Sequence, residues 1–483
     1  MAQQTVPERR NIFSKLYHWI VDGLERTVFM GIQYTFPKRF VSPLGYLGML
    51  TGFTFLTLGI TGGFLMLYYQ PTLTGCGSIT CAFESIDRIN NSIPGGYGWM
   101  LRSIHYTASN AMVLLAILHM YYQYFSGRFK IKNEILWVTG IILGIITGLE
   151  AYSGYDLIFN QRAGLAIEIG SSLANASPVI GGGLRIALFG SGFTDFILRL
   201  YSVHVFILPM IMIILVFIHF PRYLVFDLPV VSSVMGGILM LGAIFPAPYV
   251  PPASSCIANP FLAGCQYNPG NPTLTIPEWY LTGIYALLRT EFDKFVMGGI
   301  MPALLFLMAI VIPFIDTSKK LNWRDRPFFT ALGITSIAQI LITTAWGFYI
   351  NPNTSLPTLQ RLLVPPDLYF GSMIGVTIMS FGFTYAALWY IKSRERVRKA
   401  AAPLGPILSQ KWVYVVFLVL ILSQVTLMGL ALLSIYGGTF GAGTLQVVFQ
   451  GGLRNVTLFD TGALLVTFGI IVHLYRYSQS LPF

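Results

Sequence analysis

The chain has 483 residues, of which 54% are hydrophobic and only 10% are charged. Soluble proteins carry about a quarter charged residues, so a soluble core could not cover this much apolar surface. The composition also excludes a disordered chain, and the net charge of +11 does not require nucleic acid, because membrane proteins concentrate Lys and Arg on cytoplasmic loops. The sequence predicts an all-α integral membrane protein.

Residues 1–44 precede the apolar part of the chain. They are polar and mildly amphipathic, which predicts a leader with an interfacial helix and no signal peptide. Apolar runs follow, each long enough for the roughly 20 residues that a helix needs to cross the hydrocarbon layer. The ten predicted spans lie at 45–69, 99–125, 134–154, 194–220, 230–250, 294–315, 328–350, 369–391, 411–436 and 458–477.

The basic residues indicate how these spans are oriented. If the amino terminus lies inside, most of the 30 Lys and Arg residues fall on inner segments, as the positive-inside rule requires. An even number of spans places both termini on the same side. We therefore expect a multi-pass protein with both termini in the cytoplasm.

All four cysteines then lie on the outer side. Cys76 and Cys81 follow the first span, and Cys256 and Cys265 lie between the fifth and sixth spans. An oxidising compartment favours disulfides, and the pairs 76–81 and 256–265 are the simplest of the three connectivities; free structural thiols are the alternative. The absence of a CxxC motif argues against a zinc site and a c-type haem.

Four of the six histidines lie inside predicted spans, where an ionisable side chain is costly and usually functional. His105 and His119 lie 14 residues apart in the second span, and His204 and His219 lie 15 apart in the fourth. At about 100° per residue each pair shares one helix face, and a rise of about 21–22 Å separates its members into two layers.

The second and fourth spans run in the same direction, so His105 is level with His204 near the outer face, and His119 with His219 near the inner face. Two facing imidazoles at each depth suit bis-histidine ligation of two stacked haems. Histidines that only pack and hydrogen-bond are the alternative. The first four spans are predicted to form this di-haem four-helix bundle.

Glycines and arginines accompany the histidines. Two glycine pairs have a 14-residue spacing, in the first and third spans: Gly48 with Gly62, and Gly140 with Gly154. Without a Cβ they let a flat macrocycle lie against the helix, although close helix packing uses glycine too. Arg102 and Arg199 precede the outer histidines, where they either pair with haem propionates or snorkel to the interface.

On the basis of these residues, the part of the chain from about residue 12 to residue 350 resembles the cytochrome b family of quinol-oxidising cytochrome bc complexes. The matching stretches include GWMLRSIHYTASNAMVLLAILH, RLYSVHVFILP and PEWYLTGIYALLRTEFDK, and the 15-residue histidine spacing is typical of one branch. Glu278 belongs to the PEWY motif, the family's quinol-site signature. We divide the chain into a leader (1–44), the di-haem bundle (45–229), a carboxyl-terminal cytochrome b part (230–350) and three additional helices (351–483).

The resemblance implies a respiratory quinol oxidoreductase subunit. In the family, a quinol near the outer face gives one electron to a Rieske iron–sulfur protein and the other, through two haems, to a quinone at an inner site, with proton translocation. Glu278 is then the proton acceptor, because a carboxylate in an apolar pocket can take a proton and swing toward water. Tyr155 lines the same pocket. The haems are expected to be b-type, with a modified a-type as the alternative.

Some positions depart from the family pattern or mark their site poorly. Residues 158–161 differ from the family's sequence beside the outer pocket, which predicts a different quinone preference. Glu150 and Asp156 are extra acids there; they either relay protons or are outward-facing loop carboxylates. At the inner quinone site Arg222 is expected to face a quinone carbonyl, or else a lipid headgroup, with Asp22 or Asp227 as proton donor.

The expected partners are a Rieske protein, membrane lipids and a final acceptor: a cytochrome c, a blue-copper protein or a terminal oxidase. The fused architecture favours a prokaryotic plasma membrane, and a homodimeric complex is expected from the family. The main alternative is a di-haem membrane anchor that relays electrons between quinone and another oxidoreductase or terminal oxidase. A transporter that uses its intramembrane histidines is a third reading.

Overall fold

The computed structural model describes most of the chain between the leader and the last helix. The described residues are 15, 19–20, 33–35, 43–93, 97–131, 134–191, 193–220, 223–225, 227–244, 247, 250–259, 264–268, 275–395, 410–440 and 452–478. Their regular structure is helical, except for two three-residue strands, β1 (Gln33–Thr35) and β2 (Tyr223–Val225), which pair in parallel. The expectation of an all-α membrane protein is confirmed.

Eight helices in the described part of the chain are long and apolar enough to cross a membrane. They correspond to eight of the ten predicted spans. The other two runs are also helical: α4 (Tyr97–Phe125) is long but more polar, and α10 (Leu228–Ile244) is apolar but short. The polarity of α4 has a simple cause, since this helix carries Arg102 and two of the histidines.

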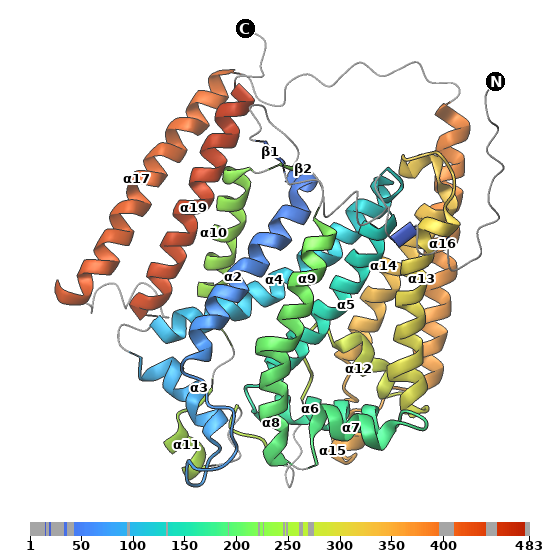
Figure 1. Cartoon of the computed structure of the whole chain (residues 1–483). Helices are drawn as coiled ribbons and strands as arrows, with labels where there is room; N and C mark the ends of the chain where they lie inside the picture. The colour runs from blue at the N-terminus through green and yellow to red at the C-terminus, as the bar shows by residue number, and fades with distance from the viewer. Residues whose placement is uncertain are drawn as a thin grey trace, which may run out of the picture.

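The first four spans lie side by side in the middle of the molecule (Figure 1). They are α2 (Leu47–Met66), α4, α5 (Glu134–Asp156) and a composite helix made of α8 (Phe193–Ser202), η4 (Val203–Ile207) and α9 (Leu208–His219). One 3-10 turn, Pro43–Tyr46, precedes α2, and another, Arg128–Lys130, follows α4. The span predicted to end at 154 reaches Asp156, so Tyr155 lies in the last turn of α5 rather than in the following loop.

The composite helix contains a π-helical turn at Val203–Ile207, which includes His204. A π-bulge takes up one extra residue within an otherwise regular helix. The side chains of His204 and His219 are therefore not rotated about the helix axis by the angle that 15 residues of a uniform α-helix would produce.

Short helices gather at one end of the bundle, the lower end in Figure 1. They are α3 (Cys81–Asn91), α6 (Gln161–Asn175), α7 (Gly181–Phe189) and α11 (Ala253–Ala258). Cys76 is disulfide-bonded to Cys81, and Cys256 to Cys265, which is the simplest connectivity. Both bridges lie at this end.

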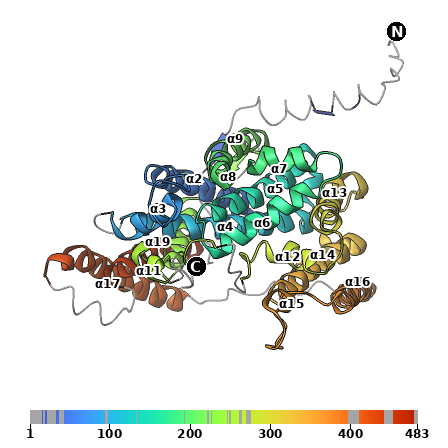
Figure 2. The ribbon, with the colours of Figure 1, turned by 90° about the horizontal axis from the view of Figure 1, so that it is seen from below.

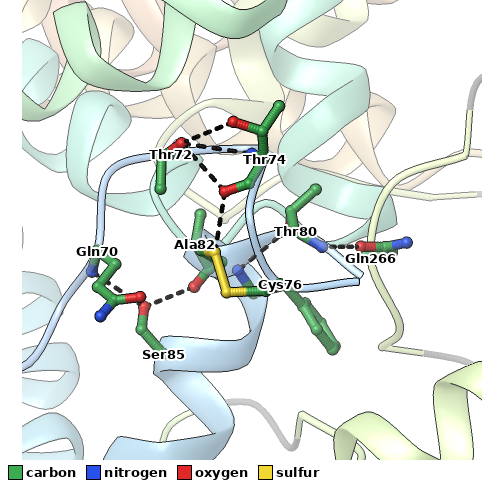
Figure 3. The surroundings of a disulfide bond; sticks show 10 residues. Gln70, Thr72, Thr74, Cys76, Thr80, Ala82, Ser85 and Gln266 are labelled. Atoms are coloured by element: carbon green, nitrogen blue, oxygen red, sulfur yellow. Dashed lines mark hydrogen bonds between the residues drawn. A yellow bond between two sulfur atoms is a disulfide. The ribbon is translucent and has the colours of Figure 1, made fainter. Parts of the chain in front are cut away.

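The two disulfide segments are connected through Thr80, the N-cap of α3 (Figure 3). Its hydroxyl accepts from the backbone N–H of Phe83 at 3.3 Å, which satisfies a donor that the first turn leaves open. Its own N–H donates to Oε1 of Gln266 at 2.8 Å, and Gln266 directly follows Cys265. The two outer segments therefore form one structural unit.

The second half of the chain flanks the bundle on two sides (Figure 2). On one side are α12 (Thr282–Leu288), η5 (Val296–Ile300), α13 (Met301–Ile315), η6 (Trp323–Asp325), α14 (Pro327–Gly347), α15 (Thr358–Arg361) and α16 (Pro366–Glu395). On the other side α19 (Gly452–Ser478) lies beside α10, and α17 (Gln410–Phe440) packs against α19.

Small residues bring α19 close to α10. A Cβ added to Gly462 would lie 2.5 Å from the carbonyl oxygen of Gly236, so both positions need glycine for the backbones to approach. The Ser232 hydroxyl donates to the Leu465 carbonyl at 2.7 Å. This contact fixes the last helix against the start of the second half of the chain.

A buried ion cluster joins the two halves of the chain. The carboxylate of Asp316, which follows α13, is fully buried and accepts from Lys130 and from Nη1 of Arg326, the latter at 2.8 Å. Nη2 of Arg326 donates to the carbonyls of Tyr124 and Phe125 at the end of α4, at 2.7 and 3.1 Å. Burial alone would raise the pKa of Asp316, but the hydrogen bonds from Lys130, Arg326 and Ser318 outweigh it and hold this pKa below its usual value.

We expect Asp316→Asn to lower the free energy of unfolding by about 3–5 kcal/mol, because it leaves buried cations without their carboxylate. The control is Asp325→Asn, which breaks an exposed pair with Lys392 at 4.0 Å and should cost less than about 1 kcal/mol. Because the folded-state pKa of Asp316 is depressed, its stabilisation is complete above the unfolded value of about 3.9 and is lost as the pH falls below it. Denaturation of the detergent-solubilised proteins measures both effects; equal losses in the two variants would contradict the prediction.

Candidate functional site

Two pairs of histidines face one another across the bundle, from α4 and from the composite helix. The imidazole rings of His105 and His204 have centroids 6.4 Å apart and planes at 84°. Those of His119 and His219 are 6.3 Å apart, at 86°. The structure brings together the same pairs, at two depths, that the helix spacing predicts.

Each of the four glycines with 14-residue spacing lies against one of these rings. A Cβ added to Gly62 would lie 3.1 Å from Cε1 of His105, and one added to Gly154 would lie 2.5 Å from Cε1 of His204. At the other level, Gly48 packs against His119 and Gly140 against His219 with corresponding distances of 2.9 and 2.8 Å. The imidazole itself is therefore one reason for glycine, in addition to the macrocycle that the sequence suggests.

Hydroxyl groups of the neighbouring helices hold the Nδ1 atoms of three of the rings. His105 lies 2.9 Å from Oγ1 of Thr61, His219 lies 3.2 Å from Oγ1 of Thr139, and His204 lies 3.2 Å from Oγ of Ser153. When Nδ1 carries the proton, Nε2 keeps its lone pair for a metal, and such an outer partner orients the ring. The pairs thus have the features of metal-binding imidazoles.

A carboxyl group lies beside the outer histidine pair. Glu278 is 7% exposed; its Oε2 accepts from the hydroxyl of Tyr106 at 3.3 Å, and Tyr106 directly follows His105. Its Oε1 pairs with Nη1 of Arg162 at 3.1 Å. Arg162 also donates from Nε to the carbonyl of Ile276 at 2.8 Å, so α6 holds both ends of this short segment.

The residues after Glu278 attach this segment to the bundle. The Trp279 indole donates to Oδ1 of Asn110 in α4 at 2.7 Å, and the Tyr280 hydroxyl donates to the carbonyl of Ala151 in α5 at 3.3 Å. Tyr155 is buried, and its hydroxyl has no hydrogen-bond partner among the described residues. A buried hydroxyl of this kind can be satisfied by a ligand.

Models of one protein family match both parts of the chain. The model "Cytochrome b/b6/petB" matches residues 33–224, which include all four paired histidines. The model "Cytochrome b(C-terminal)/b6/petD" matches residues 268–364, which include Glu278. Together the two matches cover more than half of the chain.

The chain belongs to the cytochrome b family. It is also similar to a solved chain titled "Hyperthermophilic respiratory Complex III", with 23% sequence identity and a TM-score of 0.49 over 78% of this chain and 98% of that chain. Family membership implies haem as the cofactor of this membrane-bound electron-transport protein.

The histidine pairs of this cytochrome b fit haem iron. A metal bonded at about 2 Å to one nitrogen of each imidazole would place the ring centroids about 6 Å apart, close to the observed separations. A glycine lies against each of the four rings, so no Cβ crowds the space that a flat macrocycle needs there. His105 with His204, and His119 with His219, are therefore the residues that would hold the iron.

The two arginines expected near the propionates bond to helices of the outer end. Arg102 is buried, and its Nη1 donates to Oδ1 of Asn90 in α3 at 3.3 Å. Arg199 donates to the carbonyl of Ala187 in α7 at 3.0 Å and is exposed. Both lie on the side of the outer histidine pair, and their pairing with propionates stays a prediction.

The inner quinone residues Arg222 and Asp22 lie outside the described residues. Asp227, the alternative proton donor, is fully buried, and its Oδ2 accepts from Nη1 of Arg476 at 2.8 Å, in the last turns of α19. Burial and the neighbouring Asp227 carboxylate raise the pKa of Tyr46 to about 12. Since Tyr46 is two residues from Gly48, which packs against His119, this polar cluster lies near the inner histidine pair.

Sequence reasoning missed Arg162 and Arg476. Each pairs with a predicted acid, but the partners lie 116 and 249 residues away in the sequence. No spacing rule connects residues so distant. The one signal in the sequence is the position of these arginines at the ends of apolar or amphipathic segments.

We expect Arg162→Met to lower kcat/KM for quinol oxidation about tenfold, which corresponds to roughly 1.4 kcal/mol of transition-state stabilisation. The variant removes the charged partner of Glu278 and the anchor of Ile276 while leaving the histidine pairs untouched. Arg185→Met, which removes a side chain that bonds to Ser171 on the same outer face, is the control. Steady-state quinol oxidation at equal haem content measures the effect, and equal rates in both variants would refute it.

Proposed function

We propose that this cytochrome b is the quinol-oxidising subunit of a respiratory bc-type complex, active with a Rieske iron–sulfur protein. The observation that carries the proposal is the contact between Tyr106 and Glu278, because it places a buried carboxyl group beside the outer histidine pair. Oxidation of a quinol releases two electrons and two protons, so it needs a proton acceptor next to an electron acceptor. Haem bound at the two histidine pairs supplies one-electron carriers at two depths of the membrane.

Glu278 is the proposed proton acceptor and Tyr155 a residue that lines the quinol pocket. The carboxylate is held by Tyr106 and Arg162, and after it takes up a proton its pairing with Arg162 is weaker. This weakening allows the carboxyl group to turn toward the outer aqueous side and release the proton there. The Tyr155 hydroxyl, without a partner among the described residues, is free to bind a quinol oxygen.

For the inner quinone site we propose Arg222 as the quinone contact and Asp22 or Asp227 as the proton donor; Asp227 pairs with Arg476. Proton uptake at this face and release at the outer face constitute the translocation. We further propose b-type haems, a homodimeric complex in a prokaryotic plasma membrane with cytoplasmic termini, and a cytochrome c, blue-copper protein or terminal oxidase as final acceptor.

Quinol-driven haem reduction tests the proposal against the di-haem anchor. Reduced-minus-oxidised spectra of the purified protein should contain two haem components. When quinol is added with the inner site inhibited, haem reduction should require an oxidised Rieske protein, because the two electrons leave by separate routes. Equal haem reduction without the Rieske protein would favour the anchor, and a haem-free protein would rule out both.

A further inference from the structure

His204 has a partner of a different chemical kind from that of His105, the imidazole it faces. Nδ1 of His105 has the neutral hydroxyl of Thr61 at 2.9 Å. Nδ1 of His204 lies 3.2 Å from Oε1 of the Glu150 carboxyl group, in addition to 3.2 Å from Oγ of Ser153 and 3.1 Å from the carbonyl of Glu150. Among the described residues the outer pair is therefore asymmetric, with an acid in contact with His204 and not with His105.

The position of Glu150 on α5 makes this contact specific. Glu150 lies four residues before Gly154, and residues at this spacing share a helix face. Gly154 leaves the space that the His204 ring occupies, and Glu150 reaches the outer nitrogen of the same ring. Ser153 donates its hydroxyl proton to the Glu150 carbonyl at 3.0 Å, so its oxygen is left to accept from Nδ1.

The polar contact of the Glu150 carboxyl group is the one that its Oε1 makes with the His204 ring. Its side chain is 22% exposed, and its Oε2 has no hydrogen-bond partner among the described residues. An acid within a membrane-spanning helix is costly and marks a functional position. The contact with His204 accounts for Glu150 better than the proton relay or the outward-facing loop position suggested by the sequence.

We propose that Glu150 is a positioning residue that orients His204 and makes its imidazole a more basic ligand, thereby lowering the reduction potential of the outer haem. A ligating histidine that donates its second N–H to a carboxylate is a stronger donor to the metal, which stabilises the oxidised iron. Hydrogen bonding around an axial ligand is one of the means by which a protein adjusts haem potential. The inference rests on the proposed haem ligation by His105 and His204.

The test is a spectroelectrochemical titration of the intact protein carrying Glu150→Gln. The amide keeps a similar shape and an acceptor oxygen but removes the acid, so we expect about a tenfold higher ratio of reduced to oxidised outer haem at a fixed potential. For a one-electron couple this corresponds to 59 mV. The inner haem should not change. Glu168→Gln, which removes an exposed acid of α6 on the same side of the protein, is the control and should leave both haems unchanged.

One further variant and the haem content of each protein keep the outcomes separate. Ser153→Ala removes only a neutral partner and should shift the outer haem less than Glu150→Gln. If Glu150→Gln retains both haems with unchanged potentials, or shifts both haems equally, the inference is wrong while the haem sites stand. If the wild-type protein contains no outer haem, the proposed function itself falls. A loss of the outer haem alone from Glu150→Gln would support the orienting role.

Discussion

His105→Leu is expected to remove the outer haem and leave the inner haem in place. His105 and His204 face one another at a centroid distance of 6.4 Å, so each would supply one of the two imidazoles that hold the iron, and one imidazole alone would leave the iron without its second ligand. Pyridine haemochrome analysis should give half of the wild-type haem content, and the reduced-minus-oxidised spectrum should keep one component. Quinol oxidation should become undetectable, because the outer electron acceptor is missing.

The complementary variant makes this result specific. His119→Leu should remove the other spectral component and keep the one that His105→Leu removes, because His119 pairs with His219 at the second level. Leucine fits the apolar interior of the bundle, so the helices should still assemble. Retention of both haems in His105→Leu would overturn the pairing, and loss of both in each variant would show that the two levels do not bind independently.

Glu278→Gln is expected to lower quinol oxidation by about 10²–10⁴-fold, the usual contribution of a general base. The amide oxygen can still accept the hydrogen bond from Tyr106, so the geometry is retained, but it cannot take up a proton. Haem content and spectra should match those of the wild type. The measurement is the steady-state rate with quinol and an oxidised Rieske protein at equal haem concentration.

The control for this variant is Glu168→Gln, in α6 on the same outer side, which should retain the wild-type rate. A Glu278→Gln protein with near-normal turnover would exclude this carboxylate as the proton acceptor. It would also remove the main distinction from a di-haem anchor, in which quinol need not be oxidised beside the outer histidine pair.

Much of the helical architecture follows from local features of the sequence. A span needs a run of apolar residues of sufficient length, and eight of the ten predicted runs are helices that meet this condition. The short outer helices α3, α6, α7 and α11 were not anticipated. They lie between the apolar runs and are too short to span the membrane, so hydropathy does not mark them, and they are held by contacts such as that of Thr80 with Gln266.

The sequence alone determined that this chain crosses a membrane and that its histidines can meet at two depths, because hydropathy and helical period act over neighbouring residues. Only the tertiary structure decided that Arg162 pairs with Glu278, Arg476 with Asp227 and Glu150 with His204. It also revealed the π-helical turn that takes up the extra residue between His204 and His219. Such contacts depend on how packed helices are rotated and shifted relative to one another, and this is set by side chains distant in the chain, such as those that bring α19 against α10.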